Sequence, residues 1–176
     1  ALEAHGVAVP ATIVTVGRRH IRLAAEKLGF PLVLKHNRGG KGLGVRLFYS
    51  PAALNEYLDG DAFEAPVDGI TLVQRYIKAP APFITRVEFV GGKFLYAVRV
   101  DTSQGFQLCP AAQCQVEAQP GLSDASPASA PSARFVIADG FESPLVPRYE
   151  RFLRANGIGI AGIEFIVAPD GRAFTN

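Results

Sequence analysis

The chain is 176 residues long, with 48% hydrophobic residues and a formal net charge of +2. This length and apolar content allow one domain or two small lobes, and the small charge does not indicate a nucleic acid partner. No apolar run approaches the roughly 20 residues of a membrane-spanning helix, and no signal peptide is visible. Two cysteines, Cys109 and Cys114, fit a reducing compartment, so the composition favours a cytoplasmic protein.

The first residues read as the end of one element followed by a connection. Residues 1–6 predict the end of a helix that stops at Gly6, and residues 7–15, with Pro10, predict an extended linker. The chain starts at Ala1 and contains no methionine. We therefore expect it to be a fragment of a longer protein.

A helix and a strand hairpin follow. Residues 18–28 carry apolar side chains at helical spacing and are followed by Gly29, which predicts an amphipathic helix. The apolar run 32–34 predicts a strand that leads to one cation, Lys35, and residues 45–49 predict its partner strand.

The loop between these two strands, Gly39 to Gly44, has four glycines in six residues. Its backbone N–H groups can converge on an anion, and its lysine adds charge. It is not a Walker A loop, because Lys41 is followed by Gly42, and it is not a Rossmann fingerprint, because a strand follows it. The loop suits a triphosphate; the alternative is a flexible hairpin loop with solvated lysines.

The middle of the chain is expected to continue with a short helix and a further strand. Ser50 and Pro51 predict an N-cap and first turn for a short helix through Leu58. After a polar loop over residues 59–69, residues 71–77 predict a strand that ends before prolines 80 and 82.

The clearest hairpin joins residues 83–90 to residues 93–101 through a turn at Gly91 and Gly92. A two-residue turn predicts these pairs: Val90 with Lys93, Glu88 with Leu95, Arg86 with Ala97 and Ile84 with Arg99.

Alternation of side chains along these strands predicts one polar and one apolar face. The polar face is expected to carry Arg86, Glu88 and Arg99, and the core face is expected to carry Thr85, Val87, Phe89, Phe94, Tyr96 and Val98. The polar face is either a functional surface or a solvated one.

The last third is expected to begin with an irregular exposed loop over residues 103–133 and a short strand over residues 134–138. Residues 144–155 predict an amphipathic helix, and residues 161–167 and 172–175 predict a hairpin that turns at residues 169–171. Hairpins joined by single helices predict an α+β fold with antiparallel sheets.

Glu164 lies inside the apolar strand of that last hairpin. An unpaired buried carboxylate costs several kcal/mol, so Glu164 is expected on a wet face or beside a cation.

These segments together resemble the ATP-grasp superfamily, and the resemblance covers nearly the whole chain. LVQRYIK, the basic hairpin and AGIEF are most similar to the alpha-L-glutamate ligase (RimK-like) branch. The features that carry the resemblance are Lys35 at a strand end, the loop Gly39–Gly44, the strand LVQRYI, the hairpin with Arg86 and Arg99, and AGIEF around Glu164.

The resemblance implies an α+β fold of two lobes, with mostly antiparallel sheets and flanking helices that clasp ATP. Residues 1–15 would be a linker from an absent N-terminal domain. Residues 16–77 would form the first lobe with the glycine-rich loop. Residues 78–176 would form the second lobe, truncated or incomplete at the C-terminus.

The resemblance also implies ATP and Mg²⁺ as cofactors. The nucleotide would be bound by Lys35, Gly39, Gly40, Lys41, Gly42, Gln74, Tyr76, Ile77 and Lys78, with the backbone of Tyr76 and Ile77 at the adenine. The acid that is usual in this segment is replaced here by Arg75.

For the chemistry, the resemblance implies that Arg86 and Arg99 are catalytic and face the γ-phosphate and the acyl group. Glu164 and Asn176 would be the metal ligands. Family members carry a second acid on the strand after Glu164, and no acid is present on that strand here. Asn176 is therefore either the family asparagine or a residue just short of the site.

The implied function is an ATP- and Mg-dependent carboxylate–amine ligase that acts through an acylphosphate intermediate. Its partners would be a small-molecule or peptide carboxylate and an amine, without nucleic acid or membrane; a homo-oligomer is left open. The alternatives are an ATP-grasp kinase or carboxylase, and a non-catalytic nucleotide-binding module.

Overall fold

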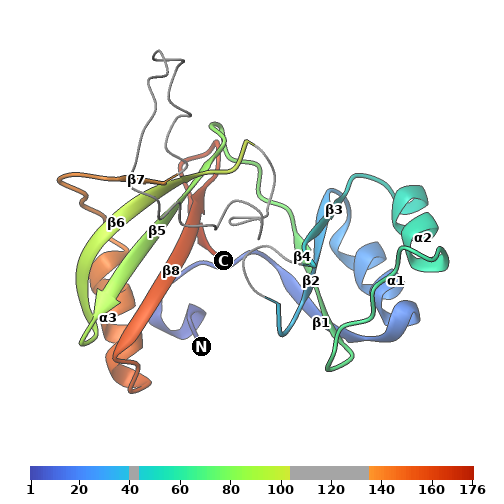
Figure 1. Cartoon of the computed structure of the whole chain (residues 1–176), viewed down its shortest axis with the longest axis horizontal. Coiled ribbons are helices and arrows are strands. Elements are labelled where there is room, and N and C mark those ends of the chain that lie inside the picture. The colour runs from blue at the N-terminus through green and yellow to red at the C-terminus, as the bar shows by residue number, and fades with distance from the viewer. Residues whose placement is uncertain (40–43, 104–134) are drawn as a thin grey trace, which may run out of the picture.

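The computed structural model describes residues 1–39, 44–103 and 135–176 of the chain. Two antiparallel sheets each carry helices on one face, and their uncovered faces look toward each other (Figure 1). The predicted α+β fold of two antiparallel lobes is confirmed. Residues 40–43 of the glycine-rich loop and residues 104–133 of the predicted irregular loop lie outside the described residues. In the part of the chain that is described, no helix is both long and apolar enough to cross a membrane.

The first lobe is built on a sheet with the strand order β1-β4-β2-β3. Ser50 starts α2 as predicted, because its hydroxyl accepts a hydrogen bond from the Ala53 N–H at 3.3 Å and Pro51 occupies the first turn. The elements of this lobe are β1 (Thr12–Val16), α1 (Gly17–Leu28), β2 (Leu32–His36), β3 (Arg46–Phe48), α2 (Pro51–Asp59) and β4 (Ile70–Arg75).

The core of the first lobe lies between this sheet and the two helices. Ile21 of α1 and Leu58 of α2 are fully buried against Leu32 of β2 and Val73 of β4. Among the described residues, no helix covers the opposite face of the sheet, which faces the second lobe (Figure 1).

The expectation of a linker over residues 7–15 is wrong. Thr12–Val16 forms the edge strand β1, which pairs antiparallel with β4, and the Thr15 hydroxyl donates to the Thr71 carbonyl at 2.9 Å. All five residues of TIVTV are β-branched and favour a strand, a signal that the preceding Pro10 obscured in the sequence.

The residues before β1 belong to the second lobe. The short 3-10 helix η1 (Glu3–His5) ends at Gly6, as predicted, and packs against α3. Val7 is 1% exposed and lies in the second core. The first sixteen residues therefore run from one lobe to the other rather than away from both.

The second lobe has a sheet with the strand order β7-β6-β5-β8-β9. Tyr149 and Leu153 of α3 are fully buried against Val87 and Phe89 of β5, which form the core face of this sheet. The elements are β5 (Phe83–Val90), β6 (Lys93–Asp101), β7 (Phe135–Ile137), α3 (Val146–Ala155), β8 (Ile160–Val167) and β9 (Ala173–Thr175).

The predicted turn at Gly91 and Gly92 is confirmed, but the predicted pairing beyond it is wrong. The register shifts between Glu88 and Phe89, so Phe89 pairs with Phe94 while Glu88 pairs with Tyr96. Leu95 is the extra residue of this β-bulge, and it moves every later residue of β6 by one position. Tyr96, Ala97, Val98 and Arg99 consequently exchange faces relative to the prediction.

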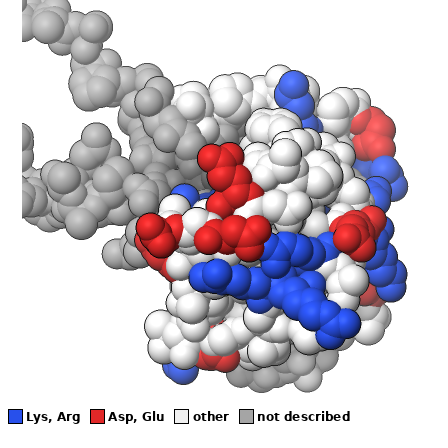
Figure 2. Space-filling view, turned by 90° about the vertical axis from the view of Figure 1, so that its right-hand side faces the viewer, with Lys and Arg blue, Asp and Glu red and all other residues white. Residues whose placement is uncertain are grey.

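The outer face of the first lobe carries a band of lysine and arginine side chains beside acidic ones (Figure 2). Arg22 pairs with Asp59 at 2.6 Å, and the guanidinium of Arg46 stacks over the ring of Tyr57 at 4.7 Å. These arginines already have partners within the lobe, which is typical of a solvated helical surface.

Candidate active site

A cavity of about 820 Å³ lies between the two lobes, where the uncovered sheet faces meet. Its walls come from β2, β4, the crossing segment 76–82, β5, β8 and the residue after β9. The predicted site residues that line it are Lys35, Gly39, Gln74, Tyr76, Ile77, Lys78, Arg86, Glu164 and Asn176. Gly40, Lys41 and Gly42 lie outside the described residues.

Lys35 enters this cavity because of its position on β2. Leu32 and Leu34 point into the first core, so alternation turns Val33 and Lys35 to the cleft. Burial lowers the pKa of Lys35 from 10.5 to about 8, and the negative charge of Glu164 opposes this shift. A pKa of about 8 leaves the ammonium group charged at neutral pH.

The two lobes touch through Lys35. Its Nζ donates a hydrogen bond to Oδ1 of Asn176, which directly follows β9. The Asn176 N–H in turn donates to the Glu164 carbonyl at 2.9 Å, so the two predicted metal ligands are neighbours across β8 and β9. Residues far apart in the sequence thus place a cation and two oxygen-bearing side chains at one point of the cleft.

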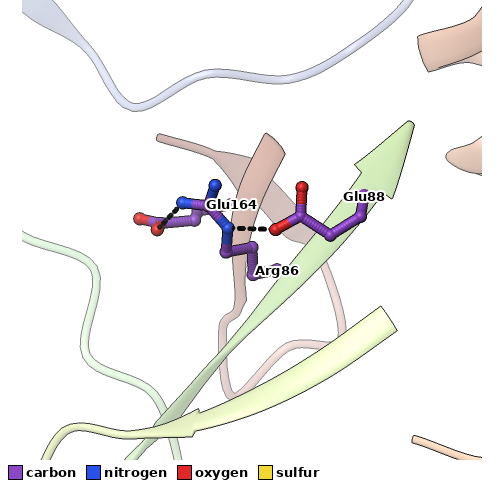
Figure 3. Close-up of polar contacts among 3 residues, drawn as sticks. All are labelled: Arg86, Glu88 and Glu164. Atoms are coloured by element: carbon purple, nitrogen blue, oxygen red, sulfur yellow. Dashed lines mark hydrogen bonds and ion pairs between the residues drawn. The ribbon is translucent and has the colours of Figure 1, made fainter. Parts of the chain in front are cut away.

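Arg86 bridges two carboxylates on the cleft face of the second sheet (Figure 3). Its Nε lies 2.5 Å from Glu88 Oε1, and its Nη1 lies 3.1 Å from Glu164 Oε1. These contacts raise the pKa of Arg86, mainly through the hydrogen bond to Glu88. Glu164 therefore has the cationic neighbour that its place in an apolar strand predicted.

Arg99 does not belong to this cluster, and the prediction that it shares a face with Arg86 is wrong. The bulge places Arg99 opposite Thr85, on the face that α3 covers, and Val98 opposite Arg86. The Arg99 guanidinium lies over the ring of Phe83, 5.3 Å from its centroid, and Arg99 does not line the cavity.

The predicted adenine segment follows β4. The Tyr76 N–H donates to the Pro31 carbonyl at 3.2 Å, so this backbone group is already used within the chain. Among the described residues, the Ile77 N–H and carbonyl have no hydrogen-bond partner, and Ile77 lines the cavity. Arg75 also lines the cavity, but its guanidinium donates to the Leu28 carbonyl at 3.1 Å.

Several lining residues were not predicted. His36, the residue after Lys35, also lines the cavity. Its imidazole packs over Gly44, where a Cβ would lie 2.7 Å from His36 Nδ1. Gly44 also has a φ of 71°, so two constraints require glycine at the end of the loop. The apolar wall, with Val33, Val100 and Ile166, could have been found from strand alternation once the register was known.

The cavity suits a ligand that carries both phosphate groups and a flat apolar ring. Lys35 and Arg86 supply positive charge, and the apolar wall and the Ile77 backbone can receive a ring. Glu164 and Asn176 supply oxygen donors. The described residues contain no group of three or more His, Cys, Asp or Glu side chains placed to hold a metal ion.

The architecture matches solved structures over its whole length. No protein-family model and no curated protein matches the sequence. A RimK domain ATP-grasp protein from Sphaerobacter thermophilus aligns over 99% of this chain with a TM-score of 0.60 and 20% identity. The ATP-grasp ligase PsnB, complexed with minimal precursor, Mg and ADP, aligns with a TM-score of 0.62 and 15% identity over 99% of this chain. The chain has the ATP-grasp fold.

A third solved structure aligns with the chain to a similar extent. D-alanine–D-alanine ligase from Bacillus anthracis aligns over 99% of this chain with a TM-score of 0.58 and 18% identity. The chain spans about half the length of these structures: 53% of the RimK domain protein, 46% of PsnB and 52% of the D-alanine–D-alanine ligase.

Proposed function

We propose that this chain is the nucleotide-binding core of an ATP- and Mg²⁺-dependent carboxylate–amine ligase. The observation that carries the proposal is the interlobe cavity, where Lys35, Arg86 and Glu164 meet from three strands of two sheets. Its support from the fold is the alignment of this ATP-grasp chain with ligases such as PsnB and D-alanine–D-alanine ligase.

The residues of the cavity fit ATP. The volume of about 820 Å³ lies within the usual range for small-molecule sites. The Ile77 backbone, unpaired among the described residues, offers one donor and one acceptor beside an apolar wall, which suits an adenine edge. Lys35 is charged at neutral pH and suits the phosphates. Gly39, Gln74, Tyr76 and Lys78 complete the proposed nucleotide site.

The end of the cavity at which Lys35 contacts Asn176 also fits Mg²⁺. Carboxylate and amide oxygens are suitable ligands for this ion, and Glu164 and Asn176 present both at neighbouring positions. Each of these side chains already contacts a cation, Arg86 or Lys35, so the position attracts positive charge. When bound, Mg²⁺ would neutralise charge on the phosphate oxygens.

The proposed reaction has two displacements. An oxygen of the substrate carboxylate attacks the γ-phosphorus, the bond from that phosphorus to the β,γ-bridging oxygen breaks, and ADP leaves. The amine nitrogen then attacks the acyl carbon of the acylphosphate, phosphate leaves with the bonding electrons, and the nitrogen loses a proton. Lys35 and Arg86 would stabilise the charge on the transferring group, mainly by their fixed positions.

The substrates proposed are a peptide or small-molecule carboxylate and an amine. Two of the neighbours support this range, since PsnB was solved with a precursor peptide and another aligned enzyme joins two D-alanines. We place the protein in the cytoplasm, because the two cysteines, Cys109 and Cys114, fit a reducing compartment.

A second candidate is a nucleotide-binding module without catalysis. It is favoured by the donor set of the described residues, in which Glu164 is the single acid that lines the cavity. Such a module would bind ATP but release neither ADP nor phosphate when a carboxylate and an amine are supplied.

Glu164→Gln in the intact protein tests the proposal. We expect wild type to bind a non-hydrolysable ATP analogue with Mg²⁺ in calorimetry and to release ADP only when carboxylate and amine are present. Glu164→Gln should lose the Mg²⁺-dependent turnover, whereas Asp59→Asn, on the outer face of the first lobe, should keep it. Absence of nucleotide binding in wild type would overturn the proposal, and binding without turnover would favour the second candidate.

A further inference from the structure

Four residues form a block on the cleft face of β5 and β8. Arg86 lies directly opposite Glu164, and Glu88 lies directly opposite Gly162. Residues two apart on a strand share a face, so three side chains and one vacant Cβ position meet there. The guanidinium of Arg86 lies between the two carboxylates (Figure 3).

Gly162 provides the space in which this guanidinium lies. A Cβ built on Gly162 would lie 2.5 Å from Cζ and 2.8 Å from Nε of Arg86, and closer still to Nη2. Real Cβ atoms do not approach other atoms this closely, so any larger residue would displace the guanidinium. Gly162 has no positive φ, and its backbone conformation is open to other residues. The requirement for glycine at this position comes from Arg86.

Glu88 holds the same guanidinium from the other side. It does not line the cavity, whereas Arg86 and Glu164 do. Its side chain is 24% exposed, and its carboxylate accepts the hydrogen bond from Nε of Arg86, which leaves Nη1 for Glu164. Glu88 therefore fixes the direction of Arg86 without offering a ligand to the cleft.

We propose that Gly162 and Glu88 are positioning residues that hold Arg86 over Glu164, so that Arg86 is the resident counter-ion of this carboxylate until a divalent cation arrives with the nucleotide. This inference rests on the function proposed above. Gly162 leaves the space that the guanidinium of Arg86 occupies. Glu88 keeps its hydrogen bond to Arg86 when Glu164 binds the metal ion.

The arrangement has a direct consequence for metal binding. A divalent cation that reaches Glu164 without nucleotide must compete with Arg86 for the carboxylate. When phosphate oxygens enter the cleft, they offer Arg86 a new partner, and Glu164 becomes available. Displacing Arg86 should therefore strengthen binding of the bare metal ion and weaken binding of the nucleotide.

Gly162→Ala and Gly159→Ala in the intact protein are a matched pair for this test. Both add one methyl group at the start of the same β-hairpin, but a Cβ on Gly159 meets no atom within 4 Å. We expect Gly162→Ala to lower the dissociation constant for Mn²⁺ without nucleotide by roughly two- to fivefold, in line with a half-exposed ion pair. It should also weaken binding of a non-hydrolysable ATP analogue, and Gly159→Ala should change neither.

A double-mutant cycle with Arg86→Ala separates this effect from general damage to the fold. Gly162→Ala should have no further effect on Mn²⁺ binding in the Arg86→Ala background, because no guanidinium remains to be displaced. Glu88→Gln should weaken binding of the ATP analogue, whereas Glu150→Gln, on α3, should not.

Three outcomes would overturn the inference. They are equal Mn²⁺ affinities of the two alanine variants, an undiminished effect of Gly162→Ala in the Arg86→Ala background, and unchanged nucleotide affinity in Glu88→Gln. Any of these, with wild type still binding the ATP analogue, would leave the proposed function intact. Failure of wild type to bind the analogue would instead reject the proposed function.

Discussion

The ammonium group of Lys35 on β2 donates a hydrogen bond to the side-chain oxygen of Asn176, 141 residues later in the chain. This contact joins the first lobe to the second at the wall of the cavity. Glu164, whose carbonyl accepts the Asn176 N–H, adds its negative charge to the environment of Lys35. One cation and two oxygen-bearing side chains therefore define the end of the cavity at which we place the phosphates.

Lys35→Met in the intact protein should weaken nucleotide binding strongly. The variant removes a charged contact on a strand that is already fixed, and a lost charge-assisted hydrogen bond costs roughly 1.5–3 kcal/mol, on the order of ten- to a hundredfold in affinity. Calorimetric titration with a non-hydrolysable ATP analogue measures the change. Lys93→Met is the control, because Lys93 is exposed and paired with Glu150. A similar affinity in both variants would contradict the assignment of Lys35.

Local signals in the sequence were sufficient for most of the elements. The Ser50 cap, the stop at Gly29 and the turn at Gly91 and Gly92 depend on residues within a few positions of each other, and the structure has all of them. Strand β1 was missed, because it is a short edge strand whose place is fixed by pairing with β4, which lies more than fifty residues away.

The site was predicted less completely, because its register depends on tertiary packing. Nothing in the sequence around Leu95 marks it as the extra residue of a bulge, yet that residue decides which face Arg99 occupies. Gly162 carried a usable signal, since a glycine inside a strand indicates a bulge or a close approach. That the approaching group is Arg86 follows only from the pairing of β5 with β8.

Glu150 predicts a pH-dependent contribution to stability. Its carboxylate accepts hydrogen bonds from the Phe94 N–H at 3.0 Å and from Lys93 at 3.3 Å, and the backbone bond is the main cause that lowers its pKa below the ordinary 4.5. Because the folded pKa is depressed, the unfolded chain binds more protons as the pH falls. The stabilisation is therefore present above pH 4.5 and is lost as the pH falls through the folded pKa.

Denaturant unfolding at pH 7 and at pH 3 tests this contribution. Wild type should be more stable than Glu150→Gln at pH 7, and the difference should shrink at pH 3. Asp59→Asn, which removes an exposed carboxylate from the first lobe, serves for comparison. A difference for Glu150→Gln that is the same at both pH values would show that the charge is not responsible.

Tyr149→Phe should destabilise the second lobe. The Tyr149 side chain is fully buried, and its hydroxyl lies 2.6 Å from Oγ1 of Thr175, itself 2% exposed. Removal of the hydroxyl leaves the Thr175 hydroxyl without this partner, and we expect a loss of about 1 kcal/mol in the free energy of unfolding. Urea unfolding measures it, with Tyr96→Phe as control because Tyr96 is 41% exposed. Equal stability of the two variants would mean that the buried bond contributes nothing.

Arg86→Ala and Arg99→Ala should differ sharply in nucleotide binding, although both remove an arginine from the same hairpin. Arg86 lines the cavity, so its loss should weaken the ATP analogue by roughly 1.5–3 kcal/mol, the range for a charge-assisted contact. Arg99 lies over Phe83 on the opposite face, and its loss should leave the affinity unchanged. The contrast depends on the single extra residue, Leu95, in β6.

Thermal unfolding of both variants is needed to interpret the comparison. Arg86 is 39% exposed, so the loss of its two ion pairs should cost little stability, at most about 1 kcal/mol by analogy with exposed pairs. A large loss of affinity in a variant that unfolds near the wild-type temperature can then be assigned to the cleft. Equal losses of affinity in Arg86→Ala and Arg99→Ala would contradict the register, because only the unshifted pairing places both guanidinium groups on the cleft face.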